Sequence, residues 1–327
     1  MHELSSELLN DVTVDKGSAL IAAFEQAALL HHVRPALGAS HWQPTYGELD
    51  AAANRLAHAL LRRSGKLEDR VAILMQHDTP AIAALLAVLK AGKIAAALNP
   101  TNPSARLRQL MDDTEPAHII TDIDHLDLAS EIAGPACAVI LFEDESGQGP
   151  DHNPSLVIGT DQTACLVYTS GSTGGPKAVM KTHRQLMHSA YVQTDALGYT
   201  AYDRIPLFGS LSSGQGINVV WSALINGAQL CPFPVIHVGI TGLRDWMIDQ
   251  QITVYYSSAS IFRNFARTLD DNVTFPLVHA VRLASESVTS DDFKLFQKHF
   301  SHRCIFVHAL SLFGNFGHCS LAQFGGR

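Results

Sequence analysis

The chain has 327 residues, of which 46% are hydrophobic and 17% are charged, and its formal net charge is −8. This composition allows a sizeable core, so it excludes global disorder, and the acidic balance argues against a nucleic-acid partner held by phosphate neutralisation. The five cysteines form no CxxC pair, the first 15 residues contain no basic segment, and the apolar stretch at 81–98 is interrupted by Lys90 and Lys93. We therefore expect a cytoplasmic protein without a disulfide framework, a secretory signal or a membrane span.

Short apolar or β-branched segments alternate with helical patterns along most of the chain. Strands are predicted at 70–75, 93–98, 117–121, 136–142, 163–168, 178–181, 228–232, 252–256, 280–284 and 304–309. Helices are predicted at 18–31, 46–63, 80–91, 103–113, 183–194, 242–250, 261–269 and 290–300. This alternation predicts an α/β fold with mainly parallel sheets.

Local signals refine the boundaries of some of these elements. Thr45, with Glu48 three residues later, forms a capping-box pattern at the start of the second predicted helix. Asp291 and Asp292 lie in the first turn of the last predicted helix, where a carboxylate interacts favourably with the helix dipole. Residues 143–153, rich in Gly, Asp, Glu and Pro, are predicted to form a surface loop.

An apolar segment that ends at Tyr168 is followed by a loop rich in glycine and hydroxyl groups. The loop residues of interest are Thr169, Ser170, Gly171, Ser172, Thr173, Gly174, Gly175 and Lys177. Glycines allow backbone N–H groups to approach a phosphate, hydroxyls donate further hydrogen bonds, and the lysine supplies a positive charge. The pattern predicts an anion-binding loop between two strands; the alternative is a polar turn without a ligand.

Other chemistries receive less support from the sequence. The loop is not a Walker A motif, because Pro176 replaces its second glycine and Ala178 replaces the hydroxyl that would hold Mg²⁺. No G-x-S-x-G motif occurs, although the serines near Lys177 loosely resemble the nucleophile region of amidase-type hydrolases, which leaves a serine hydrolase as a remote alternative. The 17 histidines show no HExxH or paired ligand spacing, so no metal site is predicted.

Residues 168–177, with the sequence YTSGSTGGPK, resemble the phosphate-binding signature of the adenylate-forming superfamily. This superfamily contains acyl-CoA synthetases, luciferases and nonribosomal peptide synthetase adenylation domains, and it usually has glycine where this chain has Ala178. Further segments resemble family motifs in the same order: TYGEL at 45–49, LKAG at 89–92, NP at 99–100, PSARL at 103–107, DDTEP at 112–116, ALINGA at 223–228 and RLASE at 282–286. The resemblance implies the layered αβαβα arrangement of mainly parallel sheets of the family's large N-terminal domain.

The resemblance also implies an activity. Members of this family activate a carboxylic acid with ATP, form an acyl-adenylate and release pyrophosphate, and the acyl group then passes to the thiol of CoA or of a carrier-protein phosphopantetheine. Residues 169–177 would hold the β- and γ-phosphates, and Lys177 would neutralise charge on the departing pyrophosphate. Ala284, Ser285 and Glu286 would lie near the adenine.

The sequence gives less information about which carboxylic acid is the substrate. In relatives that activate amino acids, an aspartate after a phenylalanine pairs with the substrate's ammonium group, but here Phe208 is followed by Gly209. A buried cation needs a partner, so the resemblance disfavours a standard α-amino acid and favours an aryl, acyl or hydroxy acid. Candidate substrate residues are Phe208, Gly209, Ser210, Ser213 and Gly214; the alternative for this segment is an ordinary Ser/Gly loop.

The sequence departs from the family pattern near its C-terminal end. Relatives carry a Y-G-x-T-E motif whose glutamate helps to bind Mg²⁺, whereas residues 293–327 contain no Asp or Glu. We expect an N-terminal extension at 1–17, a partial AMP-binding domain at 18–309 that is incomplete at the C-terminus, and an anomalous tail at 310–327 that suits a shifted reading frame. On this resemblance we also expect the small C-terminal domain with its catalytic lysine to be absent, so a catalytically incompetent fragment that at most binds nucleotide is an alternative.

Overall fold

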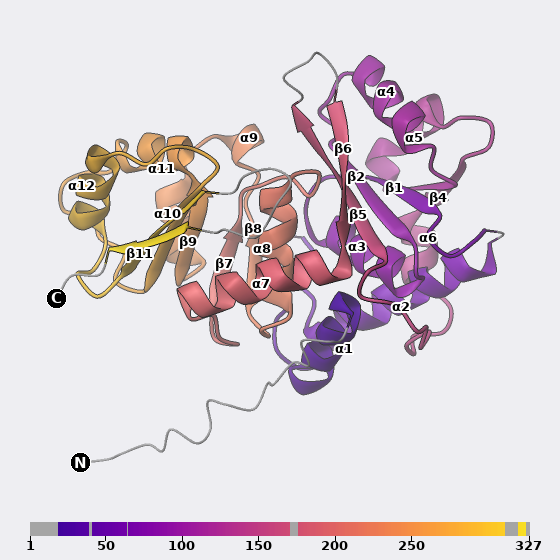
Figure 1. The fold of residues 1–327 in the computed structure, drawn as a ribbon, viewed down its shortest axis with the longest axis horizontal. Coiled ribbons are helices and arrows are strands. Elements are labelled where there is room, and N and C mark those ends of the chain that lie inside the picture. The colour runs from indigo at the N-terminus through magenta and orange to yellow at the C-terminus, as the bar shows by residue number, and fades with distance from the viewer. Residues whose placement is uncertain (1–18, 39–40, 64, 171–175, 311–319, 325–327) are drawn as a thin grey trace.

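The larger of the sheets has six strands in the order β4-β3-β1-β2-β5-β6. The structure is a computed structural model that describes residues 19–38, 41–63, 65–170, 176–310 and 320–324 (Figure 1). The six strands are β1 (Arg70–Leu74), β2 (Ile94–Leu98), β3 (His118–Thr121), β4 (Ala138–Leu141), β5 (Thr163–Ser170) and β6 (Pro176–Thr182). Neighbouring strands run parallel, except that β6 pairs antiparallel with β5.

A second group of strands lies in the C-terminal half of the described chain. It comprises β7 (Arg204–Leu207), β8 (Gln229–Pro232), β9 (Val254–Ser258), β10 (Ala280–Ala284), β11 (Ile305–Leu310) and β12 (Ser320–Phe324). The parallel pair β7-β8 adjoins the sheet β12-β11-β10-β9, because the backbone N–H of Thr253, just before β9, donates to the carbonyl of Arg204 (3.1 Å). β12 is antiparallel to β11, and β12 and Leu310, the last residue of β11, are the parts of the predicted tail that the structure describes.

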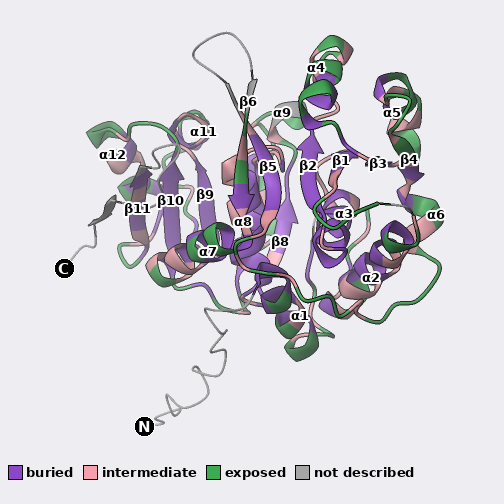
Figure 2. Ribbon diagram, turned by 45° about the vertical axis from the view of Figure 1, so that its right-hand side comes forward, coloured by how far each residue is buried: buried purple, intermediate pink, exposed green. Residues whose placement is uncertain are grey.

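Helices cover the faces of these sheets. They are α1 (Leu20–Leu30), α2 (Tyr46–Arg62), α3 (Thr79–Lys90), α4 (Ser104–Thr114), α5 (Leu126–Ile132), α6 (Phe142–Ser146), α7 (His183–Leu197), α8 (Gly214–Leu224), α9 (Val235–Val238), α10 (Leu243–Asp249), α11 (Ala259–Ala266) and α12 (Ser290–His299), with a short 3₁₀ turn, η1, at Ile123–His125. Figure 2 shows that the strands are largely buried and that exposed residues gather on the outer helices. No helix of the described residues is long and apolar enough to cross a membrane.

Alternate residues of each strand face different layers of the core. In β1, Val71 and Ile73 belong to the central cluster with α3 and α8, whereas Ala72 and Leu74 pack with α4 and α5. Alternate residues of β10 likewise pack against the central helices on one face of the sheet and against the outer helices α10 to α12 on the other. Two sheets thus alternate with three helical layers, which confirms the predicted αβαβα arrangement.

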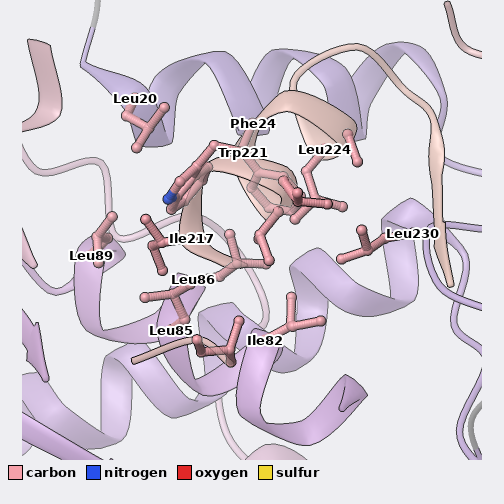
Figure 3. Packing of buried hydrophobic residues seen from close by; sticks show 14 of the residues in the cluster. Leu20, Phe24, Ile82, Leu85, Leu86, Leu89, Ile217, Trp221, Leu224 and Leu230 are labelled. Atoms are coloured by element: carbon pink, nitrogen blue, oxygen red, sulfur yellow. The ribbon is translucent and has the colours of Figure 1, made fainter. Parts of the chain in front are cut away.

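The central layer is built around α8. Its Trp221 is fully buried and lies near Leu85 and Leu86 of α3 and Phe24 of α1 (Figure 3). Burial of an aromatic side chain of this size contributes about 2–3 kcal/mol, so the contact between α3, α8 and α1 is a major source of cohesion between the two sheets. This layer fixes how the carboxyl ends of the two sheets face each other.

Two local predictions can be compared with the structure. The capping box at the start of α2 is confirmed, since Thr45 Oγ1 accepts from the backbone N–H of Glu48 (3.2 Å) and the Glu48 carboxylate accepts from that of Thr45 (2.8 Å). The surface loop predicted at 143–153 is wrong in its first part, because residues 142–146 form α6. This short helix anchors the segment on α2, where Glu145 pairs with Arg62 and Arg63.

Candidate functional site

The predicted anion-binding loop connects β5 to β6. Thr169 and Ser170 are the last residues of β5, and Lys177 lies on β6 directly opposite Thr169. Gly171, Ser172, Thr173, Gly174 and Gly175 lie outside the described residues. The hairpin therefore brings both ends of the loop to one point at the carboxyl end of the parallel sheet, the edge at which α/β proteins place their ligands.

The loop that follows β7 meets this hairpin. The backbone N–H of Tyr168 donates to the carbonyl of Ser212 (3.3 Å), so the strand before the predicted anion-binding loop is fastened to the segment of candidate substrate residues. On its other side, the hydroxyl of Tyr168 forms a hydrogen bond with that of Thr114 at the end of α4. The two predicted sites, far apart in the sequence, are neighbours in the structure.

The segment after β7 is a compact turn that begins α8. Ser213 is the N-cap of α8, because its hydroxyl accepts from the N–H of Gly216 (3.1 Å) and donates to the carbonyl of Ser210 (2.7 Å). Gly214 is the first residue of the helix. A Cβ at position 216 would lie 2.1 Å from the Ser210 carbonyl oxygen, so only glycine allows this close approach. The segment of candidate substrate residues therefore ends in a helix.

A pocket opens between the two sheets at the carboxyl ends of β1, β2, β7 and β8. It is lined by Gln76, His77, Asn99, Leu207, Phe208, Gly209, Ser210, Phe233, Pro234 and Val235. Three predicted substrate residues, Phe208, Gly209 and Ser210, line this pocket, whereas Ser213 and Gly214 do not. The lining combines aromatic rings with amide, imidazole and hydroxyl groups and contains no carboxylate, lysine or arginine.

The turn after β10 contains the three residues predicted to lie near the nucleotide. Ala284 ends the strand, and Ser285 has a left-handed backbone (φ 71°) and donates from its hydroxyl to the side-chain oxygen of Gln215 on α8 (3.3 Å). The carboxylate of Glu286 accepts from both the backbone N–H and the hydroxyl of Ser260 (2.8 Å each), so it caps the start of α11. The turn thus links β10 to α8 and α11, and the Glu286 carboxylate forms the hydrogen bonds to α11.

Four further residues at this edge were not predicted from the sequence. Gln76, His77 and Asn99 follow β1 and β2, and Gln215 lies in the first turn of α8. Their shared signal is position, since each of the first three follows the carboxyl end of a predicted parallel strand. The sequence does not show which strands are neighbours, and so these residues could not be assigned to one site.

Asp78, two residues beyond the pocket residue Gln76, has an unusual environment. Burial, together with the negative charge of Asp122, raises its pKa from 3.8 to about 6. Its side chain makes no capping hydrogen bond to α3, which it precedes. The carboxyl group therefore titrates close to neutral pH beside the pocket.

Over the residues that the structure describes, no group of three or more His, Cys, Asp or Glu side chains is placed to hold a metal ion. Mg²⁺ commonly binds through substrate phosphates and water with only one or two carboxylates, so a nucleotide-borne Mg²⁺ would not require such a group.

The family model of AMP-binding enzymes matches residues 24–310. The chain belongs to this family. The match extends over β1 to β11 and over every described segment of the site.

This AMP-binding enzyme is similar to short segments of much longer synthetases. The chain is 30% identical over 252 residues to malpinin synthetase of Mortierella alpina, a match that covers 73% of this chain and 3% of that protein. It is 29% identical over 309 residues to tyrocidine synthase 3 of Brevibacillus parabrevis, a match that covers 88% of this chain and 4% of that protein. The chain thus spans only a small part of these curated relatives.

Solved structures show the same fold. The N-terminal subdomain of Klebsiella oxytoca NpsA matches with a TM-score of 0.80 and 22% identity, over 94% of this chain and 78% of that one. The AMPPNP-bound form of the nonribosomal peptide synthetase FmoA3 matches with a TM-score of 0.82 and 19% identity, over 90% of this chain and 32% of that one.

Proposed function

We propose that this AMP-binding enzyme activates a carboxylic acid with ATP. A carboxylate oxygen attacks the α-phosphorus, the bond from that phosphorus to the bridging oxygen breaks, and pyrophosphate leaves with the bonding electrons. The observation that carries this proposal is the hydrogen bond from Tyr168 to Ser212, which fastens the β5-β6 hairpin to the pocket-lining segment. This contact holds the end of β5, which leads into the loop assigned to the phosphates, beside the segment that lines the pocket assigned to the acid, and the proposed reaction needs both groups close together.

Residues 169–177 are assigned to the β- and γ-phosphates, and Lys177 neutralises charge as pyrophosphate departs. Mg²⁺ would accompany the ATP phosphates, whose oxygens supply ligands to the ion, and it would neutralise part of their charge. Ala284, Ser285 and Glu286 are assigned to the adenine side of the site. Because the Glu286 carboxylate caps α11, we assign the nucleotide contact to the backbone of this turn.

The pocket supports an acid that carries no ammonium group. Gly209 supplies no carboxylate at the position after Phe208, and the other lining side chains are uncharged or aromatic. An aryl, acyl or hydroxy acid fits this lining, with Phe208 and Phe233 against its apolar part. The K. oxytoca NpsA subdomain, of the same fold, has been solved with 3-hydroxybenzoyl-AMSN and with anthranilyl-AMSN. The acyl acceptor would be a CoA or carrier-protein thiol.

Lys177→Ala tests the phosphate assignment. A hydrogen bond to a charged group contributes about 1.5–3 kcal/mol, so we expect ATP–pyrophosphate exchange with pooled carboxylic acids to fall about 10- to 100-fold. Lys294→Ala is the matched control, since this exposed lysine on α12 pairs only with its neighbour Asp291 among the described residues. Equal exchange by the Lys177→Ala variant and the wild-type chain would contradict the assignment.

Two alternatives have distinct outcomes in the same experiment. A partial domain at 18–309 that only binds nucleotide would bind ATP but show no exchange, in keeping with the absence of Asp and Glu from 293–327. An amidase-type serine hydrolase would instead be labelled by a fluorophosphonate at Ser170 or Ser172 without ATP.

A further inference from the structure

Arg282, the central residue of β10, is a buried cation. It is 7% exposed, and its guanidinium donates to Oε1 of Gln193 on α7 (3.1 Å) and lies over the ring of Tyr256 (4.5 Å from the centroid). Among the residues that the structure describes, no carboxylate forms an ion pair with it, and outside them Asp and Glu occur only within residues 1–18. Charged side chains are seldom buried to this extent without a counter-charge, so these surroundings favour an anionic ligand.

The side chain of Arg282 faces the central layer of the fold. Ala280 and Ala284, which precede and follow it by two positions on β10, belong to the central cluster, and successive side chains of a strand alternate between its faces. In this layer α7 packs against β10, β11 and α8 (Figure 1). The hydrogen bond to Gln193 therefore spans the interior of the fold, between β10 and α7.

A buried hydroxyl group lies near the same charge. Tyr199, which follows α7, is 5% exposed, and its hydroxyl has no hydrogen-bond partner among the described residues. Burial raises the pKa of Tyr199, and the positive charge of Arg282 opposes this rise, so the two groups are close enough to interact. A guanidinium and a hydroxyl that both have hydrogen atoms to donate form the kind of donor set that binds a carboxylate.

Asp203 does not neutralise Arg282. It lies at the amino ends of β7, β9 and β10, where its two carboxylate oxygens accept four hydrogen bonds of 2.6–3.0 Å. Two come from Thr200, one from the hydroxyl of Thr253 and one from the imidazole of His279. These bonds satisfy the carboxylate and join the three strands, so Asp203 has a structural role of its own.

Arg282 lies within reach of the edge at which the site is built. It is two residues before the end of β10, a distance of about 7 Å along the strand. Beyond that end, Ser285 donates to Gln215 in the first turn of α8, the helix that begins just after the pocket residue Ser210. An acid whose reacting carboxylate lies at this edge can therefore reach Arg282 with a second acidic group across a spacer of a few carbon atoms.

We propose that Arg282 and Tyr199 bind a second carboxylate of the acid, so that the substrate is a dicarboxylic acid of the aryl or acyl class. This inference rests on the proposed function. The planar guanidinium and the Tyr199 hydroxyl donate hydrogen bonds to the carboxylate, whereas Gln193 and the ring of Tyr256 orient the guanidinium. A single carboxylate matches the single positive charge of Arg282.

Isothermal titration calorimetry of the full chain without ATP tests this proposal. The probes are glutarate and isophthalate, with valerate and benzoate as the matched monocarboxylic acids. We expect at least one dicarboxylic acid to bind about tenfold or more tightly than its match, because a second carboxylate forms charge-assisted hydrogen bonds. Equal affinities within both pairs would overturn the proposal. Binding of sulfate as tight as that of the dicarboxylic acids would assign Arg282 to an inorganic anion and would also overturn it.

Two variants separate a binding role from a structural one. Arg282→Met should abolish the preference for dicarboxylic acids without lowering the unfolding temperature of the ligand-free chain, because an apolar side chain replaces a buried charge. Tyr199→Phe removes only a hydroxyl that lacks a partner among the described residues, so it should fold normally and weaken dicarboxylate binding about tenfold. Tyr255→Phe is the matched control, since Tyr255 is equally buried on β9 but belongs to the outer cluster. Unchanged dicarboxylate binding in Tyr199→Phe, with a lower unfolding temperature in Arg282→Met, would overturn the proposal.

ATP–pyrophosphate exchange with the same four acids separates this proposal from the proposed function. Exchange with a dicarboxylic acid that is lost in Arg282→Met would support both. Exchange with the monocarboxylic acids at equal or higher rates would uphold the proposed function and overturn the assignment of Arg282. Tight binding of a dicarboxylic acid without exchange would support the assignment of Arg282 as a carboxylate-binding residue and contradict the proposed function.

Discussion

At the residue scale, the surroundings of Asp78 differ from what its sequence position suggests. It precedes α3, where an aspartate would be expected to cap the helix, yet it makes no capping hydrogen bond. Burial and the nearby Asp122 instead raise its pKa to about 6. Ionisation of Asp78 therefore lowers the stability of the folded chain.

This cost predicts a pH dependence of stability. The carboxyl ionises near 3.8 in the unfolded chain and near 6 in the folded chain, so the folded chain binds the proton more tightly. The contribution to stability is greatest below pH 4 and is lost as the pH rises through 6. Asp78→Asn should raise the free energy of unfolding at pH 7.5 by about 1–2 kcal/mol.

Urea denaturation between pH 4.5 and 7.5 measures this effect, with Asp124→Asn, an exposed carboxylate of the same edge, as the control. The difference between Asp78→Asn and the wild-type chain should grow with pH. A difference that is constant or shrinks over this range would contradict the pKa assigned to Asp78.

At the element scale, two adjacent aspartates of α12 have different roles. Asp291 is exposed and pairs with Lys294, as expected for the first turn of a helix. Asp292 is fully buried, and its carboxylate forms two hydrogen bonds with Arg263 of α11 (2.7 Å each) and accepts two from Thr289. Burial opposes ionisation of Asp292, but these bonds lower its pKa overall. The carboxylate thus joins α11 to α12.

Asp292→Ala should therefore destabilise the fold far more than Asp291→Ala. Removal of one partner of a buried ion pair leaves the other without compensation, and we expect a loss of about 3 kcal/mol. The exposed pair at Asp291 should contribute less than about 1 kcal/mol. Thermal unfolding of the two variants at pH 7 measures the contrast; equal losses would show that Asp292 acts only through the helix dipole.

The elements differ in how well the sequence predicts them. Apolar segments such as Ile94–Leu98 are predicted because strands buried on both faces have few polar residues. β7 is missed because it contains Pro206, and proline argues against a strand. Proline has no backbone N–H, so a strand tolerates it only where that position donates no hydrogen bond to the neighbouring strand. α8 is missed because its two glycines, Gly214 and Gly216, indicate a loop, although close packing against Ser210 requires Gly216.

At the scale of the whole molecule, the alternation of predicted strands and helices indicates an α/β protein, and the resemblance to the family motifs implies its layers. The sequence alone does not order the strands, because the sheet order β4-β3-β1-β2-β5-β6 depends on long-range pairing. The same limit applies to the site: the glycine-rich loop is visible as a motif, but the approach of Ser212 to Tyr168 is visible only in the fold. The pocket residues Gln76 and Asn99 come from strands whose adjacency no local pattern shows.

Carboxylate-dependent ATP–pyrophosphate exchange by the purified full chain tests the central claim most directly. Separate pools of aryl, acyl, hydroxy and α-amino acids would be compared, with Lys177→Ala as the blank. We predict exchange above the blank with at least one of the first three pools and none with the α-amino acids, because position 209 provides no carboxylate for an ammonium group. If a cooperatively folded chain showed no ATP–pyrophosphate exchange with any pool, the result would contradict the account. It would show that the chain has the fold but lacks the adenylating activity.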